Sequence, residues 1–212
     1  MAHGGTNFGF YGGANTGDSS SNYQPDLTSY DYDAPIRESG DVDNSKYSEI
    51  RKTISKFTTA KIPAVPPNNA KEGYGSIKLQ NFGSLFDCLD VAISGTTVES
   101  REPLSMEDVN QNFGLILYVT NYEQKQEVSI LSVLEVHDIA KFFISCPGPG
   151  ERKGIKHVYV GEIDRWLNRN LTLPNLKCAS NVTLYILVEN MGRVNYGPYI
   201  FDRKLENVFS SP

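Results

Sequence analysis

Tyrosines and aspartates alternate in Tyr30-Asp31-Tyr32-Asp33, and this string is the part of the sequence best suited to binding chemistry. In an extended segment the rings lie on one side and the carboxylates on the other. Saccharide sites combine aromatic faces with groups that hydrogen-bond to hydroxyls. The string therefore predicts either a sugar-binding segment or a surface turn, and composition alone leaves these two alternatives open.

Glycoside hydrolysis needs two carboxyl groups close in space, a protonated acid and an ionised nucleophile or base. Glu38 and Glu189 are the acids that stand near expected strand ends. Glu38 lies in a polar turn, and Glu189 ends an apolar run far away in the sequence, so the two form no convincing pair. Salt-bridge or hydrogen-bond roles are favoured for both.

Two histidines invite a catalytic interpretation. His3 stands beside Gly4-Gly5, and His137 precedes Asp138. Structural roles are favoured for both, because a lone histidine is more often a hydrogen-bonded structural residue and no nucleophile-elbow Ser or Cys accompanies His137. The glycine-rich segment 4–9 lacks the lysine and the glycine spacing of a phosphate loop.

The three cysteines, Cys88, Cys146 and Cys178, are widely spaced and include no Cys-x-x-Cys pair. We expect from them neither a zinc site nor a disulfide framework, and we expect no cofactor or metal. Two sequons begin at Asn170 and Asn181, and both are glycosylation candidates if the chain passes through the secretory pathway. They favour a secreted protein.

Charge and hydropathy exclude two classes of partner. The net charge is -5 and the basic residues are scattered, so we expect no nucleic acid partner. The longest apolar runs, such as 115–119 and 184–188, are the length of strands and far too short to cross a bilayer. Residues 1–20 lack the order of a signal peptide and open directly on glycine-rich sequence, so we expect that Met1 is not the natural beginning.

Three regions must position the tyrosine-aspartate string. Residues 1–60 hold a long Gly-, Asn- and Tyr-rich loop and a helix, for which Asp41, Asp43 and Asn44 offer N-caps. The helix carries an apolar face at helical spacing, formed by Tyr47, Ile50, Ile54 and Phe57. Residues 61–74 are a proline-rich linker, where prolines favour extended backbone.

Residues 75–209 show short apolar or alternating runs separated by turn residues, which is the pattern of an antiparallel β-sandwich. The run 182–189 is apolar on both alternating sets and is expected to be a central strand covered on both faces. Strands are expected at 75–80, 83–91, 113–120, 128–136, 139–145, 155–160, 182–189 and 195–201.

Several motifs together resemble one enzyme family. They are His3-Gly4-Gly5-Thr6-Asn7-Phe8-Gly9-Phe10, Gly13-Ala14-Asn15, Thr28-Ser29-Tyr30-Asp31-Tyr32-Asp33-Ala34-Pro35 and Glu38-Ser39-Gly40-Asp41. In this order and at this spacing they resemble the β-galactosidases of glycoside hydrolase family 35, and Val188-Glu189-Asn190-Met191-Gly192-Arg193-Val194-Asn195-Tyr196-Gly197 resembles a further motif of that family. Pro25-Asp26-Leu27-Thr28 and the loop length look most similar to plant members.

The resemblance implies a fold that is mainly β with a small α part. Residues 1–60 would be the C-terminal remnant of a (β/α)8 barrel, comprising the end of its last strand, its active-site loop and its closing helix. An antiparallel, galactose-binding-like β-sandwich would follow at 75–209. Relatives often carry Arg after the His-Asp pair, where this chain has Ile139, and this departure calls into question any salt bridge that the Arg carries.

The resemblance also implies a function. Tyr32 matches the family tyrosine that contacts galactose near the nucleophile, and we predict that it binds substrate. The two catalytic glutamates and another sugar-contacting tyrosine would precede Met1, so we expect no catalytic residue in this chain. The parent would be a retaining β-galactosidase that acts on a β-galactoside or galactan-type saccharide in the apoplast, cell wall, vacuole or lysosome.

Three interpretations of the chain follow. In the first it needs the remainder of the parent enzyme and is inactive alone. In the second it is a non-catalytic module that interacts with carbohydrate or protein. In the third it is a pseudogene or an incomplete gene model without a function of its own, and its sign would be poor solubility, because the apolar helix face would lack the barrel sheet that it should cover.

Overall fold

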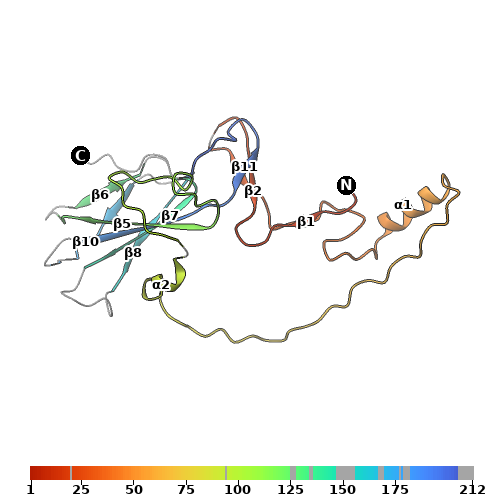
Figure 1. The fold of residues 1–212 in the computed structure, drawn as a ribbon, viewed down its shortest axis with the longest axis horizontal. Coiled ribbons are helices and arrows are strands. Elements are labelled where there is room, and N and C mark those ends of the chain that lie inside the picture. The colour runs from red at the N-terminus through yellow and green to blue at the C-terminus, as the bar shows by residue number, and fades with distance from the viewer. Residues whose placement is uncertain are drawn as a thin grey trace. The chain divides into compact units, whose positions relative to one another are not determined.

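The structure is a computed structural model, and it describes residues 1–19, 21–93, 95–124, 128–133, 136–146, 156–166, 170–176, 178 and 182–204. The chain divides into two compact units (Figure 1). Unit 1 comprises Met1–Gly12 and Leu27–Gln80, and unit 2 comprises Gly13–Asp26 and Asn81–Pro212. The segment Gly13–Asp26 therefore interrupts unit 1 in sequence but belongs to unit 2.

Unit 2 is built on a four-stranded antiparallel sheet. Its strands in spatial order are β5 (Leu115–Tyr122), β10 (Val182–Glu189), β7 (Ile139–Ser145) and β8 (Val158–Asp164). A two-stranded ribbon of β6 (Ser129–Ser132) and β9 (Asn170–Leu173) adds a second layer, because its Leu131 and Leu173 join the same core as the sheet. Mainly β structure with antiparallel sheets is thus confirmed.

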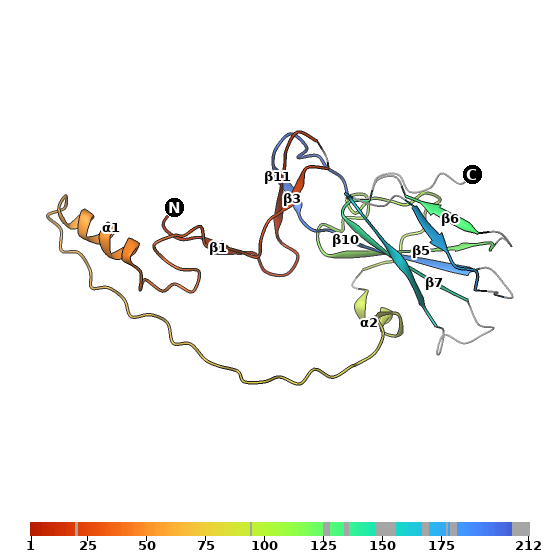
Figure 2. The same ribbon diagram turned by 180° about the vertical axis from the view of Figure 1, so that it is seen from behind.

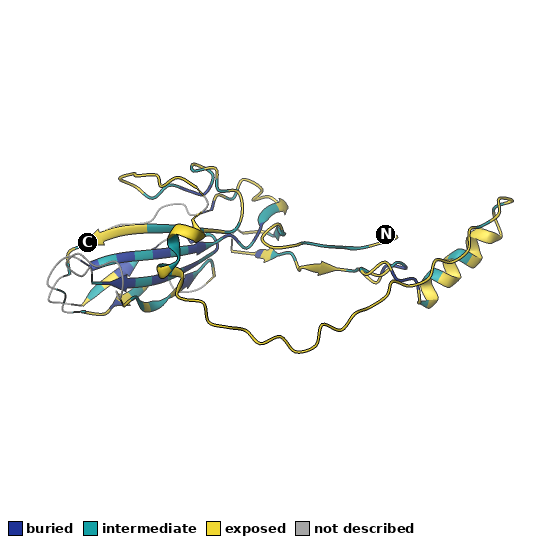
Figure 3. Ribbon diagram, turned by 60° about the horizontal axis from the view of Figure 1, so that its bottom comes forward, coloured by how far each residue is buried: buried dark blue, intermediate teal, exposed yellow. Residues whose placement is uncertain are grey.

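The central strand β10 shows why this sequence forms a sheet. Val182, Leu184, Ile186 and Val188 alternate with less buried residues and are all buried in the core. On the opposite face Tyr185 and Leu187 are half-buried. The predicted central position is correct, and Figure 3 shows buried residues alternating along these strands.

A bulge in β8 fits the ribbon against the sheet. The register between β7 and β8 shifts at Phe142 and Phe143. Gly161 at this bulge has φ 153°, and a Cβ there would lie 3.0 Å from Leu171 Cδ2 of β9. Glycine therefore allows the ribbon to approach closely.

A small three-stranded sheet completes unit 2. Strand β2 (Gly13–Thr16) pairs antiparallel with β3 (Tyr23–Pro25) and parallel with β11 (Arg193–Tyr196). Figure 2 shows β3 close to β11, although the two are far apart in the sequence. The β2–β3 hairpin is thereby joined to the end of the sandwich.

Unit 1 holds two short strands and a helix. Strands β1 (Gly5–Thr6) and β4 (Ser29–Tyr30) pair antiparallel, and His3 forms an isolated bridge with Ile36. The predicted helix is confirmed as α1 (Ser45–Ser55), whose cap Asn44 accepts a hydrogen bond from the backbone N–H of Tyr47. None of its residues is buried, and Ile50, Ile54 and the following Phe57 are exposed.

The strands predicted at 75–80 and 83–91 are wrong. Residues 58–84 form neither helix nor strand among the described residues, and a 3₁₀ turn (Leu85–Asp87) and the short helix α2 (Leu89–Ala92) follow. The Ser84 side chain accepts a hydrogen bond from the backbone N–H of Phe86. Such a cap favours a helical turn over an extended strand, even in a run whose apolar residues alternate.

Other strand boundaries also differ. The predicted strand 195–201 is shorter and earlier, at Arg193–Tyr196, and turns follow it. Strand β9 was not predicted at all. The predicted domain boundaries at residues 60 and 74 stay predictions. The two compact units divide the chain at other positions, and their contacts do not test whether either predicted domain folds on its own.

Candidate functional site

The candidate site begins with the contact between Tyr30 and the glycine pair at the start of the chain. The ladder between β1 and β4 pairs Gly5 with Tyr30 and Thr6 with Ser29. A Cβ on Gly5 would lie 2.5 Å from the phenolic oxygen of Tyr30, and a Cβ on Gly4 would lie 2.1 Å from the Tyr30 carbonyl oxygen. The glycines therefore leave the space in which Tyr30 sits.

The chain then turns sharply instead of continuing as an extended strand. The backbone N–H of Ala34 donates to the Asp31 carbonyl oxygen over 3.0 Å, and Tyr32 and Asp33 both have φ 51°. The predicted alternation of rings and carboxylates across an extended segment is therefore wrong beyond Tyr30. A left-handed backbone at two consecutive residues that are not glycine is uncommon, and such strain clusters at functional sites.

The turn brings the two tyrosine rings together. Tyr30 and Tyr32 meet edge to face, with ring centroids 5.9 Å apart and planes at 74°. Tyr32 is 70% exposed, whereas Tyr30 is 38% exposed. Tyr32 thus presents a ring face and a phenol, and Tyr30 supports it from the side.

The carboxylates of this region are bound within the loop. Glu38 accepts hydrogen bonds from the hydroxyls of Ser29 and Thr6, and these bonds lower its pKa. Its backbone N–H donates to Asp31 Oδ1 over 3.0 Å. A glycosidase acid needs a raised pKa, so Glu38 fastens the loop as an ionised acceptor and is not suited to be the acid.

Asp33 is held in the same way by helix α1. Lys46 Nζ donates to both the carbonyl oxygen and the carboxylate of Asp33, and this interaction lowers the pKa of Asp33. The pair lies on the exposed surface. The first turn of the helix therefore restrains the turn that carries Tyr32.

A second polar cluster is buried in unit 2. Asp138 and Lys204 have no exposed surface, and Arg165 donates to both Asp138 and Asp202 at 2.6 and 2.7 Å. Two acids thus face two bases, so the buried charges balance. The cluster joins the start of β7, the end of β8 and the segment after β11.

Tyr23 of β3 extends this buried cluster to the hairpin. Its hydroxyl lies 2.6 Å from the Gly192 carbonyl oxygen and 3.2 Å from Asp138 Oδ2, and the Arg165 guanidinium lies 4.1 Å from the centre of its ring. Burial, followed by the charge of Asp138, raises the pKa of Tyr23. Tyr23 is therefore a neutral anchor for the β2–β3 hairpin.

Local sequence patterns gave no signal for this cluster. Tyr23 and Asp138 are 115 residues apart, and Asp138 and Lys204 are 66 apart. A structural role was favoured for the His137-Asp138 pair, and His137 Nδ1 lies 2.8 Å from the Arg203 carbonyl oxygen and 3.2 Å from Asp202 Oδ1. Glu189 accepts a hydrogen bond from Asp138 N–H through its backbone oxygen.

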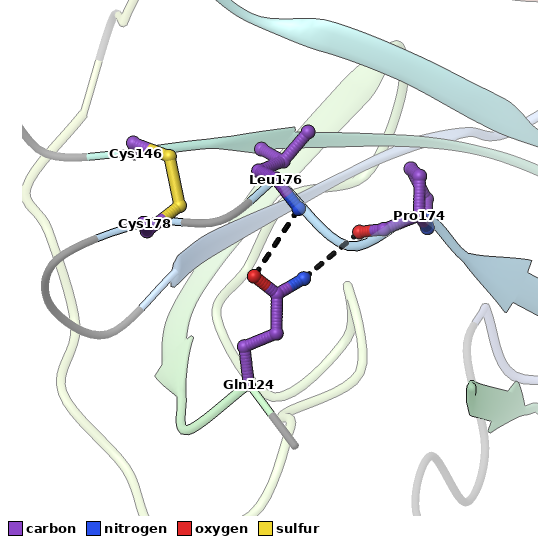
Figure 4. The surroundings of a disulfide bond; sticks show 5 residues. All are labelled: Gln124, Cys146, Pro174, Leu176 and Cys178. Carbon is purple, nitrogen blue, oxygen red and sulfur yellow. Dashed lines mark hydrogen bonds between the residues drawn. A yellow bond between two sulfur atoms is a disulfide. The ribbon is translucent and has the colours of Figure 1, made fainter. Parts of the chain in front are cut away.

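Cys146 and Cys178 form a disulfide, which corrects the expectation of no disulfide framework. They are 32 residues apart, but one follows β7 and the other shortly precedes β10, its antiparallel neighbour. Spacing alone could not place them together. Figure 4 shows Gln124 beside the bond, where its amide donates to the Pro174 carbonyl oxygen and accepts from the Leu176 N–H.

Of the two predicted glycosylation sites, the structure describes only one. Asn170 is exposed at the start of β9, whereas Asn181 lies outside the described residues. Within the described ranges no group of three or more metal-ligating side chains occurs. No helix among those same residues is long and apolar enough to span a membrane.

Residues 1–57 match the family described as glycosyl hydrolases family 35, and residues 103–209 match the family described as β-galactosidase, first all-beta domain. The chain is 50% identical to β-galactosidase 17 of Arabidopsis thaliana and 52% identical to β-galactosidase 8 of Oryza sativa subsp. japonica. It is 38% identical to a β-galactosidase of Mus musculus.

Each of these three alignments covers 96% of the chain. The same alignments span 29–30% of the length of the three relatives.

Proposed function

Because this chain belongs to the β-galactosidases of glycosyl hydrolase family 35, we propose that it contributes the substrate-binding wall of an enzyme that removes terminal, non-reducing β-D-galactose with retention. The observation that carries this proposal is the exposed Tyr32, held in a strained turn against Tyr30. Strain of this kind positions a side chain for a ligand.

Tyr32 is suited to contact a sugar in two ways. Its ring offers an apolar face, and its phenol donates or accepts a hydrogen bond with a sugar hydroxyl or a catalytic carboxylate. Glu38 and Asp33 support the turn through Ser29, Thr6 and Lys46. The carboxylates thus restrain Tyr32, and the phenol makes the contact with substrate.

Catalysis itself requires the remainder of the parent enzyme. The resemblance implies that the acid/base and the nucleophile lie on earlier barrel strands, and the lowered pKa of Glu38 does not suit the role of the acid. Without a carboxyl pair the covalent route is lost, and binding alone does not replace it. We propose that residues 1–212 in isolation hydrolyse no galactoside.

The secretory pathway is the proposed location of the parent. The Cys146–Cys178 disulfide supports this location, because disulfides persist in oxidising compartments. The cell wall, apoplast, vacuole and lysosome all lie on this route.

A non-catalytic carbohydrate- or protein-interaction module is the alternative. It is favoured by the fact that unit 2 has its own hydrophobic core. The reading frame upstream of Met1 separates the two proposals. Barrel strands ending in two glutamates support the enzyme, and an unrelated sequence supports the module.

The decisive experiment supplies the missing part in trans. Residues 1–212 are assayed with a chromogenic β-galactoside, alone and after co-expression with the upstream part of the parent. We expect no turnover alone and turnover after reassembly. Turnover by the isolated chain that is abolished by mutating one of its own acids would overturn the proposal.

A further inference from the structure

The sequon Asn170-Leu171-Thr172 lies within strand β9, and its register places its side chains on defined faces. Asn170 pairs with Ser132 of β6, and Thr172 pairs with Ile130. Alternation turns Leu171 and Leu173 toward the core, whereas Asn170 and Thr172 are exposed on the outer face of the ribbon. Both residues that define the sequon are therefore on one accessible surface.

The amide of Asn170 is already oriented. Ser132 Oγ donates to Asn170 Oδ1 over 2.6 Å. This bond uses the amide oxygen, whereas a glycan is attached through the nitrogen. The hydrogen bond is therefore compatible with a glycosylated side chain, whose oxygen still accepts.

Two apolar side chains are exposed on the β6 side of the ribbon. Ile130, directly opposite Thr172, is 61% exposed, and Val128 just before β6 is also exposed. A sugar attached at Asn170 would lie over this face of the ribbon and shield Ile130 from other chains.

We propose that Asn170 carries an N-linked glycan that covers the outer face of the β6–β9 ribbon. The donor is an oligosaccharide linked through pyrophosphate to a lipid. Asn170 Nδ2 forms a bond to the anomeric carbon, the bond from that carbon to the pyrophosphate oxygen breaks, and the lipid pyrophosphate leaves while the amide nitrogen gives up one proton. This site depends on the proposed secretory route of the parent.

The experiment directs the 212-residue chain to the secretory pathway of plant cells with an added signal peptide. Secreted protein is analysed by site-resolved glycopeptide mass spectrometry, and free thiols are counted to verify the Cys146–Cys178 bond. We expect a glycan on Asn170 in most molecules. The added signal peptide brings the chain into the pathway whatever the native location of the parent is. An unmodified Asn170 therefore counts against the glycosylation site and not against the proposed secretory location. Fluorescence imaging of the tagged parent tests that location separately.

Four variants separate modification from structure. Asn170→Gln and Thr172→Val remove the sequon and are expected to abolish the glycan at this position. Thr172→Ser retains the sequon and Ser132→Ala removes only the hydrogen bond, so both are expected to retain it. Secreted, disulfide-bonded wild type with unmodified Asn170, or a glycan at Asn170 that persists in Thr172→Val, overturns the inference.

Discussion

Asp138 and Lys204 form a fully buried ion pair, with Lys204 Nζ 3.0 Å from Asp138 Oδ2 and neither side chain exposed. They belong to segments that are 66 residues apart. The pair lies where β7, the end of the sandwich and the β2–β3 hairpin meet. Its loss should therefore affect all of unit 2 and not one strand.

Replacing Lys204 by Met keeps the volume of the side chain but takes one positive charge away from the buried carboxylates of Asp138 and Asp202. We expect a loss of about 3–5 kcal/mol in the free energy of unfolding, since breaking a buried pair leaves an uncompensated charge. Urea denaturation measures this loss. Lys46→Met, which removes the exposed partner of Asp33, is the control and should leave the midpoint unchanged.

Asp202 makes the stability of unit 2 depend on pH. Burial alone would raise the pKa of Asp202, but hydrogen bonds from Arg165 and the nearby His137 and Lys204 outweigh burial and lower it. The folded pKa lies below the unfolded value of about 3.9. The stabilisation is thus present above about pH 4 and is lost as the pH falls through the folded pKa.

Asp202→Asn tests this linkage. The variant should be less stable than wild type at pH 7, and the difference in urea midpoint should shrink as the pH is lowered below about 4. A difference that stays constant down to the acid transition would contradict the role of Asp202.

Removing the Cys146–Cys178 bond releases a constraint on the unfolded chain. For a separation of 32 residues we expect the double variant Cys146→Ala, Cys178→Ala to lose about 2–4 kcal/mol of unfolding free energy. The same measurement on Cys88→Ala, which removes a free cysteine, is the matched control and should show little change. Equal effects of the two changes would argue against a stabilising disulfide.

Tyr23→Phe removes the hydroxyl that bonds to Gly192 and Asp138 but keeps the ring under Arg165. Leaving these acceptors without the phenol should cost about 1–3 kcal/mol. In hydrogen exchange, the Asp26 amide, which donates to the Gly13 carbonyl oxygen, should exchange faster, while amides of β10 stay protected. Tyr196→Phe, on the exposed part of the same small sheet, is the control.

Tyr32→Phe in the reassembled enzyme tests the proposed sugar contact. Loss of one hydrogen bond to substrate, worth about 0.5–1.5 kcal/mol, should lower kcat/KM roughly 2- to 12-fold without changing the unfolding midpoint. The control is Tyr74→Phe. Tyr74 is exposed in the segment 58–84, which forms neither helix nor strand, and its replacement should leave kcat/KM unchanged. Equal losses for both variants would remove Tyr32 from the binding wall.

Short stretches of sequence predicted those elements whose conformation depends on neighbouring residues. Strand β10 follows from an apolar run, and α1 follows from its Asn44 cap and helical spacing. A surface turn was one of the two alternatives for the tyrosine-aspartate string, but the left-handed conformation of Tyr32 and Asp33 was not predicted, since neither residue is a glycine. Its conformation is imposed by contacts from Lys46 and Glu38, which lie on other segments.

The buried cluster was hidden for a different reason. Asp138, Arg165 and Lys204 have the composition of a solvated surface, and only the antiparallel topology brings them together. The same topology joins Cys146 to Cys178. Spacing along the chain therefore predicted neither the ion pairs nor the disulfide.

The hairpin that crosses into unit 2 also sets an order of events during synthesis. Tyr23 leaves the ribosome long before its partner Lys204, which is 181 residues further on. At about 5–20 residues per second, this distance corresponds to roughly 10–35 s of translation. For nearly all of that interval β11 has not been made, so Ala14 and Tyr23, both buried in the finished protein, lack part of the structure that covers them.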